Sequence, residues 1–479
     1  MNDTNGPENL RYGGTVAAAH PVYILAMLLA GLLILFLRRE KAIYPLIIVG
    51  LILPYGQAVT VFSAHFQMLR FLILFGWTRM LWSRLRNTSG EDRSQGLHPI
   101  DKAFIAMVGV ILITTIILTP KGAAAFNAAG EAYTSIGVYL LLRFLVRDEE
   151  DILRSAKALV LVCVVAAVVM ILEQTNHINV FGYLGGESLH SAIREGRLRS
   201  QAFFGHPIIA GCYGATILPL CVWLWSKGRL GKLYAVVGAV SAVIMILTSA
   251  SSTPLMGTAG AILAFGFWPL RRQMRWVRRG IVLMLILLHM FMHGPVWSLI
   301  EHIDLVGGNS AYHRYQLVNQ CIRHFWDWWL FGTLANGSWG WDMWDTANVF
   351  VGTAEGSGLL ALILFVALFS RSFRAIGNAR VAFEADGPKQ FALWTMGCVV
   401  FTQLMVFVGV NYFDQTRMVW YLILCMVIAI TGEYGLVPAR AHLDESESAN
   451  AKPVILRPAG VIGGSRLSQF GPRRSEKIR

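Results

Sequence analysis

The sequence is poor in charge. Only 14% of its 479 residues are Asp, Glu, Lys or Arg, whereas 55% are hydrophobic. A soluble domain carries about 25% charged residues. Apolar runs of 18 or more residues recur along the chain, and each is long enough to cross about 30 Å of hydrocarbon. Alternating ten-residue strand patterns are lacking, so the sequence favours membrane helices.

The sequence also lacks the common cofactor and nucleotide motifs. It has no Walker A loop, no GxGxxG, no HExxH and no GxSxG. Its six cysteines show no CxxC or zinc spacing. We therefore expect no cofactor, no metal and no ATP hydrolysis, so an enzyme here would need an already activated substrate. The net charge of +13 lies mostly in short loops, which argues against a nucleic-acid partner.

The hydropathy pattern predicts an all-α, polytopic membrane protein with about thirteen transmembrane helices. The expected helices cover residues 21–37, 42–62, 64–82, 102–119, 123–146, 152–173, 207–226, 233–250, 254–270, 280–293, 349–370, 391–409 and 418–434. Lys and Arg concentrate in alternate loops, which are then cytoplasmic. This predicts a multi-pass protein of a bacterial inner membrane, with its N-terminus outside and its C-terminus in the cytoplasm.

Three parts of the chain follow from this topology. Residues 1–20 form an external N-terminus, residues 21–434 the transmembrane domain, and residues 435–479 a basic, disordered cytoplasmic tail. Two external loops are long, at about 173–206 and 293–348. Long loops with their own apolar pattern are usually functional, so the site is expected on the external side.

The second long loop contains a predicted helix that lies at the membrane interface. Its sequence is HRYQLVNQCIRHFWDWWL, beginning at His313. Apolar residues recur in it at spacings of three and four, and tryptophans are typical of the interface. The predicted apolar face consists of Leu317, Cys321, Ile322, Phe325 and Trp329.

Arginine occurs in loops that the topology predicts to be external and that should be poor in basic residues. These arginines are Arg194, Arg197, Arg199, Arg314, Arg323 and Arg417. The guanidinium group keeps its charge and pairs bidentately with phosphate. The pattern therefore indicates an anionic ligand on the external face. The alternative is contact with lipid headgroups, or salt bridges to carboxylates of the same loops, namely Glu187, Glu195, Glu301 and Asp304.

Acid–base candidates lie near these arginines. Asp342 and Asp345 precede Asn348 in the segment NGSWGWDMWDTANVFV. A carboxylate among aromatic residues can have a raised pKa and act as a general base. The alternative is helix capping by Asp345 or Thr346. The other candidates are histidines: His206 before Pro207, and His313 beside Arg314. A lone histidine is more often structural than catalytic.

Three stretches resemble the O-antigen ligase and O-antigen polymerase superfamily, which are membrane glycosyltransferases of the GT-C type. RSQAFFGHPIIAG at 199–211 is similar to the family's Arg-to-Pro segment that enters a helix. ILTSASSTPLMG at 246–257 is similar to its Ser–Arg–Gly segment between two helices. The stretch from 313 to 365 resembles its Arg-bearing loop helix and closing helix. The likeness covers roughly residues 150–375.

The resemblance implies a function and partners. The family transfers glycans from undecaprenyl diphosphate on the external face, in lipopolysaccharide or exopolysaccharide synthesis, either to lipid A–core (ligases) or to another repeat unit (polymerases). The expected partners are a lipid-linked oligosaccharide donor, a glycan or lipid acceptor, the membrane and polysaccharide-assembly proteins. Arg199 and Arg314 would hold the diphosphate, and Asp345 would act as base with help from His313. The secondary binding candidates are Arg197, Arg417, His206 and Asn348.

This sequence departs from the family pattern at three places. Ligases carry a His–Asn pair where Asp345 and Asn348 stand here. The Ser–Arg–Gly arginine is missing from Ser251–Pro254, and the glycine of the first motif is Ala202. These departures favour a divergent branch of the superfamily over a ligase.

Two other classes of function remain open. A transporter or flippase of a lipid-linked or anionic solute is the alternative, although such proteins usually show paired repeats, and the sequence shows none. A non-catalytic partner of a polysaccharide-assembly complex is the third.

Overall fold

The computed structural model describes residues 17–61, 64–86, 96–302 and 310–432. They belong to one compact unit, Met1–Leu436. The structure is mostly helical, at 78%. Most of the predicted N-terminal segment 1–20, the whole predicted tail 435–479, and Asp304 lie outside the described residues.

Six of the described helices are long and apolar enough to cross a membrane. They are α4 (Pro99–Leu118), α6 (Glu149–Asn176), α7 (Pro207–Trp225), α8 (Gly228–Thr248), α13 (Val349–Ala382) and α14 (Gly387–Gly409). Their length and composition identify a mostly helical, multi-pass membrane protein, which confirms the coarse prediction.

The other apolar helices are shorter or more polar. They are α1 (Pro21–Phe36), α2 (Arg39–Ile52), α3 (Met68–Arg86), α5 (Gly122–Leu145), α9 (Ser252–Gly266), α10 (Met274–Phe291) and a last helix, Arg417–Gly432. Each of the thirteen predicted ranges therefore contains a helix. The number of membrane crossings stays a prediction.

Strands between α2 and α3 correct the predicted helices 42–62 and 64–82. β2 (Gln57–Val61) and β3 (Ala64–Gln67) form an antiparallel hairpin, and β1 (Ala17–Ala18) pairs in parallel with β2. Pro54 and Gly56 interrupt the helical pattern, and the β-branched residues that follow them favour a strand. Composition alone marked this stretch as apolar and did not separate strand from helix.

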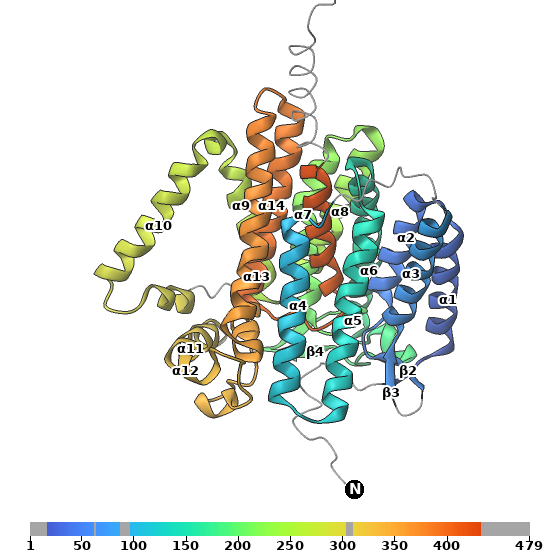
Figure 1. Cartoon of the computed structure of the whole chain (residues 1–479), viewed down its shortest axis with the longest axis horizontal. Coiled ribbons are helices and arrows are strands. Elements are labelled where there is room, and N and C mark those ends of the chain that lie inside the picture. Colours follow the sequence, from blue (N-terminus) through green and yellow to red (C-terminus); the bar gives the residue numbers. More distant parts are fainter. Residues whose placement is uncertain (1–16, 62–63, 87–95, 303–309, 433–479) are drawn as a thin grey trace, which may run out of the picture. The chain divides into compact units, whose positions relative to one another are not determined.

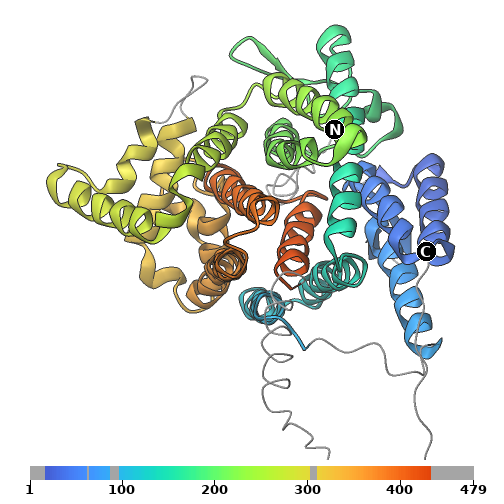
Figure 2. The same ribbon diagram turned by 90° about the horizontal axis from the view of Figure 1, so that it is seen from above.

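The last helix lies at the centre of the bundle. Residues 418–431 are all buried, as expected for a helix that is apolar all round. Figure 2 shows this helix surrounded by α4, α7 and α14. Its first residue, Arg417, lies at the end of the bundle where the two long loops gather.

A carboxylate on α5 neutralises two arginines near this end. Glu131 Oε2 is 2.9 Å from Arg417 Nη2, and Glu131 Oε1 is 3.3 Å from Arg70 Nη2. Tyr55 donates its hydroxyl proton to Glu131 Oε1 at 3.0 Å and accepts a hydrogen bond from Arg417 at 2.8 Å. Arg70 also donates to Thr134 at 3.1 Å. Arg70, a charged residue within an otherwise apolar stretch of α3, is therefore paired.

Removing this carboxylate should destabilise the bundle. We predict that Glu131→Gln lowers stability by about 2 kcal/mol, less than for a fully buried pair because the Glu131 side chain is 37% exposed. The six described cysteines are all free and buried, so a thiol-reactive dye reports unfolding on heating. The exposed Glu195→Gln is the matched control. Equal unfolding temperatures for both variants would contradict the role of Glu131.

Candidate functional site

The two long loops meet at one end of the bundle (Figure 1). The first loop contains a two-stranded hairpin, β4 (Ala192–Arg194) and β5 (Arg197–Arg199). The second contains α11 (Ser310–Arg323) and α12 (Phe325–Trp328). Between them the loops, at about 173–206 and 293–348, carry seven of the eight residues that the sequence predicts for the site, all except Arg417.

The predicted loop helix exists but is shorter than expected. α11 ends at Arg323, and the chain turns at His324 before α12. Leu317 and Cys321 are buried as predicted, whereas Ile322 is exposed, and Trp328 replaces Trp329 as the buried tryptophan. The Trp328 Nε1–H donates to the Cys321 carbonyl at 2.7 Å. Because the helix breaks, the three- and four-residue spacing does not continue past Arg323.

A cavity of about 660 Å³ opens between these loops and the ends of α7, α13 and α14. This volume is within the range of small-ligand sites. The predicted site residues that line it are Arg199, His206, His313, Arg314, Asp345 and Arg417. Its lining also includes Arg194 and Asp342, which the sequence indicated as an external arginine and an acid–base candidate, and residues that it did not indicate, among them Asn336, Glu355 and Tyr412.

Arg199 is buried at the wall of this cavity, with 7% of its surface exposed. Its Nη2 donates to Ser251 Oγ at 2.7 Å and its Nε donates to the Ser249 carbonyl at 3.3 Å. Within the described part of the chain, no carboxylate pairs with it. Burial, with a smaller contribution from Arg194, lowers the pKa of the Arg199 guanidinium to about 10. It stays charged at neutral pH, and an anion in the cavity would stabilise it.

Arg314 is held by the two residues that follow Ser251. Its guanidinium donates to Ser252 Oγ at 3.3 Å and to Thr253 Oγ1 at 2.9 Å, and the residue is 7% exposed. Three consecutive hydroxyl side chains at the start of α9 therefore orient both arginines. In this segment the superfamily that the sequence resembles carries an arginine, which is missing here. Its hydroxyl groups instead accept hydrogen bonds from Arg199 of the first loop and Arg314 of the second.

The segment that carries Arg199 is fixed to the end of α6. Glu173 accepts hydrogen bonds from the backbone N–H groups of Gln201 at 2.8 Å and Ala202 at 2.6 Å. Ala202 has φ +54°, a left-handed conformation that favours glycine. At this position the superfamily that the sequence resembles carries glycine. Glu173 therefore stabilises the strained turn at Ala202. The sequence did not indicate that these two residues are in contact.

His206 caps α7 rather than standing free. Its Nδ1 accepts the Ile208 N–H at 3.2 Å. Burial and the charges of Arg199 and Arg194 lower the pKa of His206 to about 4. The imidazole is therefore neutral at neutral pH, and its Nε2 carries the proton. Asp414 fixes the preceding residue by accepting from the Gly205 N–H at 3.2 Å.

The carboxylates Asp342 and Asp345 lie beside His313. His313 Nε2 lies 3.1 Å from the Asp345 carbonyl oxygen. The pKa of Asp345 is raised, mainly because burial at the cavity wall disfavours the charged carboxylate. The neighbouring His313 lowers this pKa, and the like charge of Asp342 raises it further. Asp342 has φ +60°, which is uncommon for a residue other than glycine. Such strained positions cluster at functional sites.

These three residues also have the layout of a metal site. One ligand atom from each of His313, Asp342 and Asp345 lies within 4.8 Å of the other two. Carboxylates with an imidazole suit a divalent cation that also contacts a phosphate. The sequence predicts that the protein needs no metal, and this cluster makes a test of that prediction with a chelator necessary.

Glu355 is a buried carboxylate of the cavity that was not predicted. It lies on α13, is 3% exposed and accepts from Asn336 Nδ2 at 3.1 Å. α13 is broken three residues later at Gly358, which has φ +83°. A Cβ at Gly358 would lie 2.6 Å from the Leu330 carbonyl oxygen, so the α12 turn packs directly on this break. The Glu–Gly pattern of the closing helix was the available sequence signal.

Three predicted site residues have other surroundings. Arg197 is exposed on β5 and does not line the cavity, while Arg194 on the paired strand does. Arg417 lines the cavity but is neutralised by Glu131. Asn348 is the N-cap of α13, with Oδ1 accepting from Phe350 N at 2.9 Å and Val351 N at 3.2 Å. The alternative that Asp345 or Thr346 caps this helix is therefore wrong, because Asn348 satisfies both N–H groups.

The sequence matches no protein-family model, and no curated protein is significantly similar to it. The proposal of a function therefore depends on the geometry of the cavity and on the motifs quoted from the sequence.

Asn348 offers a test that separates capping from ligand binding. We predict that Asn348→Ala lowers stability by about 1 kcal/mol, as for other N-cap deletions, and that Asn348→Asp, which keeps the acceptor oxygen, does not. Thermal unfolding in detergent measures this difference. If Asn348→Asp unfolds like wild type but abolishes activity, the side chain contacts substrate as well as capping the helix.

Proposed function

We propose that the protein is a membrane glycosyltransferase that transfers or polymerises a glycan carried on undecaprenyl diphosphate, at the external face of a bacterial inner membrane. The single observation that best supports this proposal is the pair of buried guanidinium groups in one cavity, oriented by consecutive hydroxyl side chains. Such a pair is suited to a diphosphate, because each planar guanidinium can donate two parallel hydrogen bonds to phosphate oxygens.

The proposed reaction needs no external energy source. The acceptor hydroxyl oxygen attacks the anomeric carbon of the donor sugar, a new C–O bond forms, and the bond from that carbon to the diphosphate oxygen breaks. Undecaprenyl diphosphate leaves with the bonding electron pair. Arg199 and Arg314 would stabilise the negative charge that develops on this leaving group, which lowers the barrier.

Asp345 is the proposed general base. It would accept the proton of the acceptor hydroxyl as the new bond forms. His313 contacts the Asp345 backbone and belongs to the same helix as Arg314, so the base and the phosphate site are linked through adjacent residues of α11. Neutral His206 could donate a hydrogen bond from Nε2 to the ligand, and Glu355 is the competing candidate for the base.

A transporter or flippase of a lipid-linked or anionic solute is the second candidate. The break in α13 at Gly358 beside buried Glu355 favours it, because transporters bind solutes at broken helices. The cavity lining does not extend along the bundle: it comes from residues 194–208, 313–347, 352–356 and 409–417, which lie at the loop end. That distribution favours chemistry at one membrane surface over passage through the bundle.

Substitution of the cavity arginines tests the proposal. In a deletion strain of the source bacterium, we predict that wild type restores the glycan profile and that Arg199→Ala, Arg314→Ala and Asp345→Asn do not, with transfer reduced at least about 100-fold, as for loss of a transition-state donor. Gel and mass spectrometric profiles of lipid-linked intermediates measure this. Single repeat units on the carrier would indicate a polymerase, and full-length chains on the carrier a ligase.

The control for this experiment is Arg197→Ala, which removes an exposed arginine of the same hairpin outside the cavity. Normal glycan from both Arg199→Ala and Arg314→Ala, at normal protein levels, would refute the site. An unchanged profile in the deletion strain itself would refute the glycosyltransferase proposal and favour transport. Retained activity in Asp345→Asn with loss in Glu355→Gln would move the base to Glu355.

The pH dependence of transfer tests the base. A base acts in its ionised form, so activity should be lost as the pH falls through the pKa of Asp345. Because that pKa is raised, the acidic limb of the pH–rate profile should lie above the range of an ordinary Asp. We predict that Asp342→Asn, which removes one cause of the raised pKa and is tolerated at positive φ, moves the limb to lower pH.

Initial rates with purified protein and lipid-linked donor measure this limb. An unmoved limb in Asp342→Asn would contradict the assignment of Asp345. Rates in excess EDTA separate the base role from metal ligation: we expect no change. Loss of activity that is restored by Mg²⁺ or Mn²⁺ would instead assign His313, Asp342 and Asp345 to a cation.

A further inference from the structure

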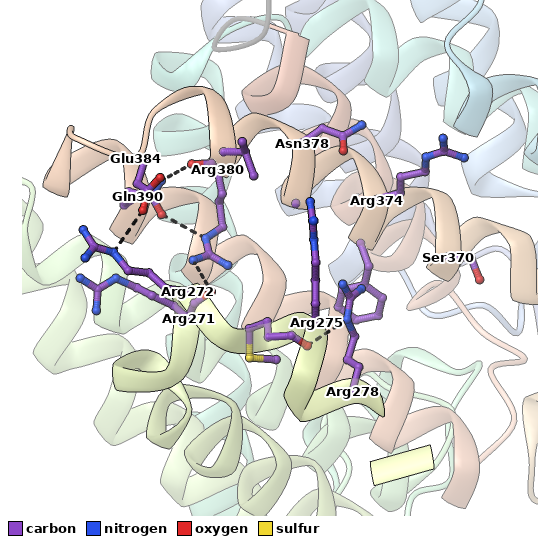
Figure 3. A pocket seen from close by; sticks show the side chains of 14 residues that line it. Arg271, Arg272, Arg275, Arg278, Ser370, Arg374, Asn378, Arg380, Glu384 and Gln390 are labelled. Atoms are coloured by element: carbon purple, nitrogen blue, oxygen red, sulfur yellow. Dashed lines mark hydrogen bonds and ion pairs between the residues drawn. The ribbon is translucent and has the colours of Figure 1, made fainter. Parts of the chain in front are cut away.

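A second cavity, of about 440 Å³, lies between α10 and the C-terminal half of α13. Six arginines and one glutamate line it, with Ser370, Asn378 and Gln390 as neutral polar groups. The arginines are Arg271, Arg272, Arg275, Arg278, Arg374 and Arg380. Figure 3 shows these side chains distributed around the cavity, on both of its sides. None of them belongs to the candidate glycosyltransferase site.

Helical spacing explains why several of these arginines line the same cavity. Arg271, Arg275 and Arg278 recur at four and three residues, from the end of the 3₁₀ helix η3 (Trp268–Gln273) into α10. Arg374 and Arg380 come from α13 on the opposite side. In the view of Figure 3, the Arg275 side chain extends between Arg380 and Arg374.

Carboxylates compensate little of this charge. Glu384 pairs with Arg272, at 3.2 Å between Oε1 and Nε. Arg380 instead donates to Gln390 Oε1 at 3.1 Å and to the Arg271 carbonyl at 3.3 Å. Arg275 and Arg374 have no carboxylate partner in the part of the chain that the structure describes. An anion in the cavity would relieve the repulsion between these like charges.

The apolar length of α10 indicates what kind of anion this is. α10 has no buried residue, and its side chains from Ile281 to Leu287, with Met290 and Phe291, are at least 42% exposed. In Figure 1 α10 stands apart from the neighbouring helices. Its arginines precede this apolar stretch, so a basic end is followed by about 16 Å of apolar helix. That length matches one leaflet of a hydrocarbon core about 30 Å thick.

The position of the cavity along α13 agrees with a membrane surface. At a rise of 1.5 Å per residue, Arg374 lies about 24 Å along α13 from the break at Gly358, and Glu355, which lines the first cavity, lies before that break. This is close to the thickness of the hydrocarbon core. The two cavities therefore lie at opposite ends of the bundle, and the second is at the end that the sequence predicts to be cytoplasmic.

We propose that this cavity binds the headgroup phosphate of an anionic glycerophospholipid, whose acyl chains lie along the exposed apolar side chains of α10. The lipid would join α10 to α13 by filling the space between them. Arg275 and Arg374 would contact the phosphate, and the neutral polar side chains of Asn378 and Ser370 also line the cavity. A soluble phosphate would satisfy the arginines but would leave α10 without an apolar partner.

Native mass spectrometry of the full chain in detergent tests this proposal, with dioleoyl phosphatidylglycerol and dioleoyl phosphatidylcholine as probes. We expect wild type to retain phosphatidylglycerol in preference to phosphatidylcholine. Each of Arg275→Glu and Arg374→Glu should reduce this preference roughly fivefold or more. Arg229→Glu, a reversal at an exposed arginine of α8, is the matched control and should leave the preference unchanged.

If the charge-reversal variants do not give a monodisperse protein, the double variant Arg275→Gln with Arg374→Gln, which only removes the two charges, replaces them. Soluble glycerol phosphate at the same concentration distinguishes the two sources of phosphate, and we expect no displacement of lipid. Equal competition by glycerol phosphate would overturn the lipid proposal in favour of a free anion. No lipid preference in wild type, or the same preference in the double variant, would also overturn it.

Discussion

The candidate site depends on the burial of two guanidinium groups at the end of an apolar bundle. Such burial is unfavourable unless each charged group is hydrogen-bonded. Here Ser251, Ser252 and Thr253 supply the acceptors for Arg199 and Arg314. Neutral hydroxyls satisfy the N–H donors but leave the positive charge of Arg199 without a counter-ion in the described residues. The arrangement therefore orients the guanidinium while preserving its attraction for an anion.

The loop end of the bundle is held by buried carboxylates that accept backbone N–H groups. Glu173 accepts a hydrogen bond from the Ala202 N–H, and Asp414 accepts one from the Gly205 N–H. The backbone between Arg199 and His206 is therefore restrained. Asn348 does the same for the start of α13. A site held by such contacts needs little reorganisation when a ligand arrives, which is a condition for electrostatic stabilisation of a transition state.

Several features of this site could be predicted from the sequence, because they depend on local pattern. Arg199 and Arg314 stood out because they oppose the usual charge bias of external loops, and both line the cavity. The loop helix followed from its three- and four-residue spacing. Its end at Arg323 could not be predicted, because the three- and four-residue spacing of apolar residues in the sequence continues through Phe325 and Trp329.

Long-range pairing explains what the sequence did not indicate. Glu131 lies more than 280 residues from Arg417, and Arg199 is about fifty residues from Ser251, so no local pattern joins them. The strands at 57–67 were missed because an apolar run of that length is typical of both strand and helix. The left-handed φ of Ala202 was also hidden, because an alanine gives no local signal of that conformation.

The two arginine-rich cavities differ in how their charges are held. In the first, Arg199 and Arg314 are nearly fully buried and fixed by side-chain hydroxyls, so their positions are set before any ligand binds. In the second, Arg275 and Arg374 carry long side chains with few described partners, and such side chains can adapt to a headgroup of variable shape. Fixed guanidiniums suit a reaction in which charge develops at a defined place. Adaptable ones suit a lipid that is retained but not transformed. On this reasoning, the end with the loops carries the proposed chemistry, and the end with α10 anchors the bundle to its bilayer.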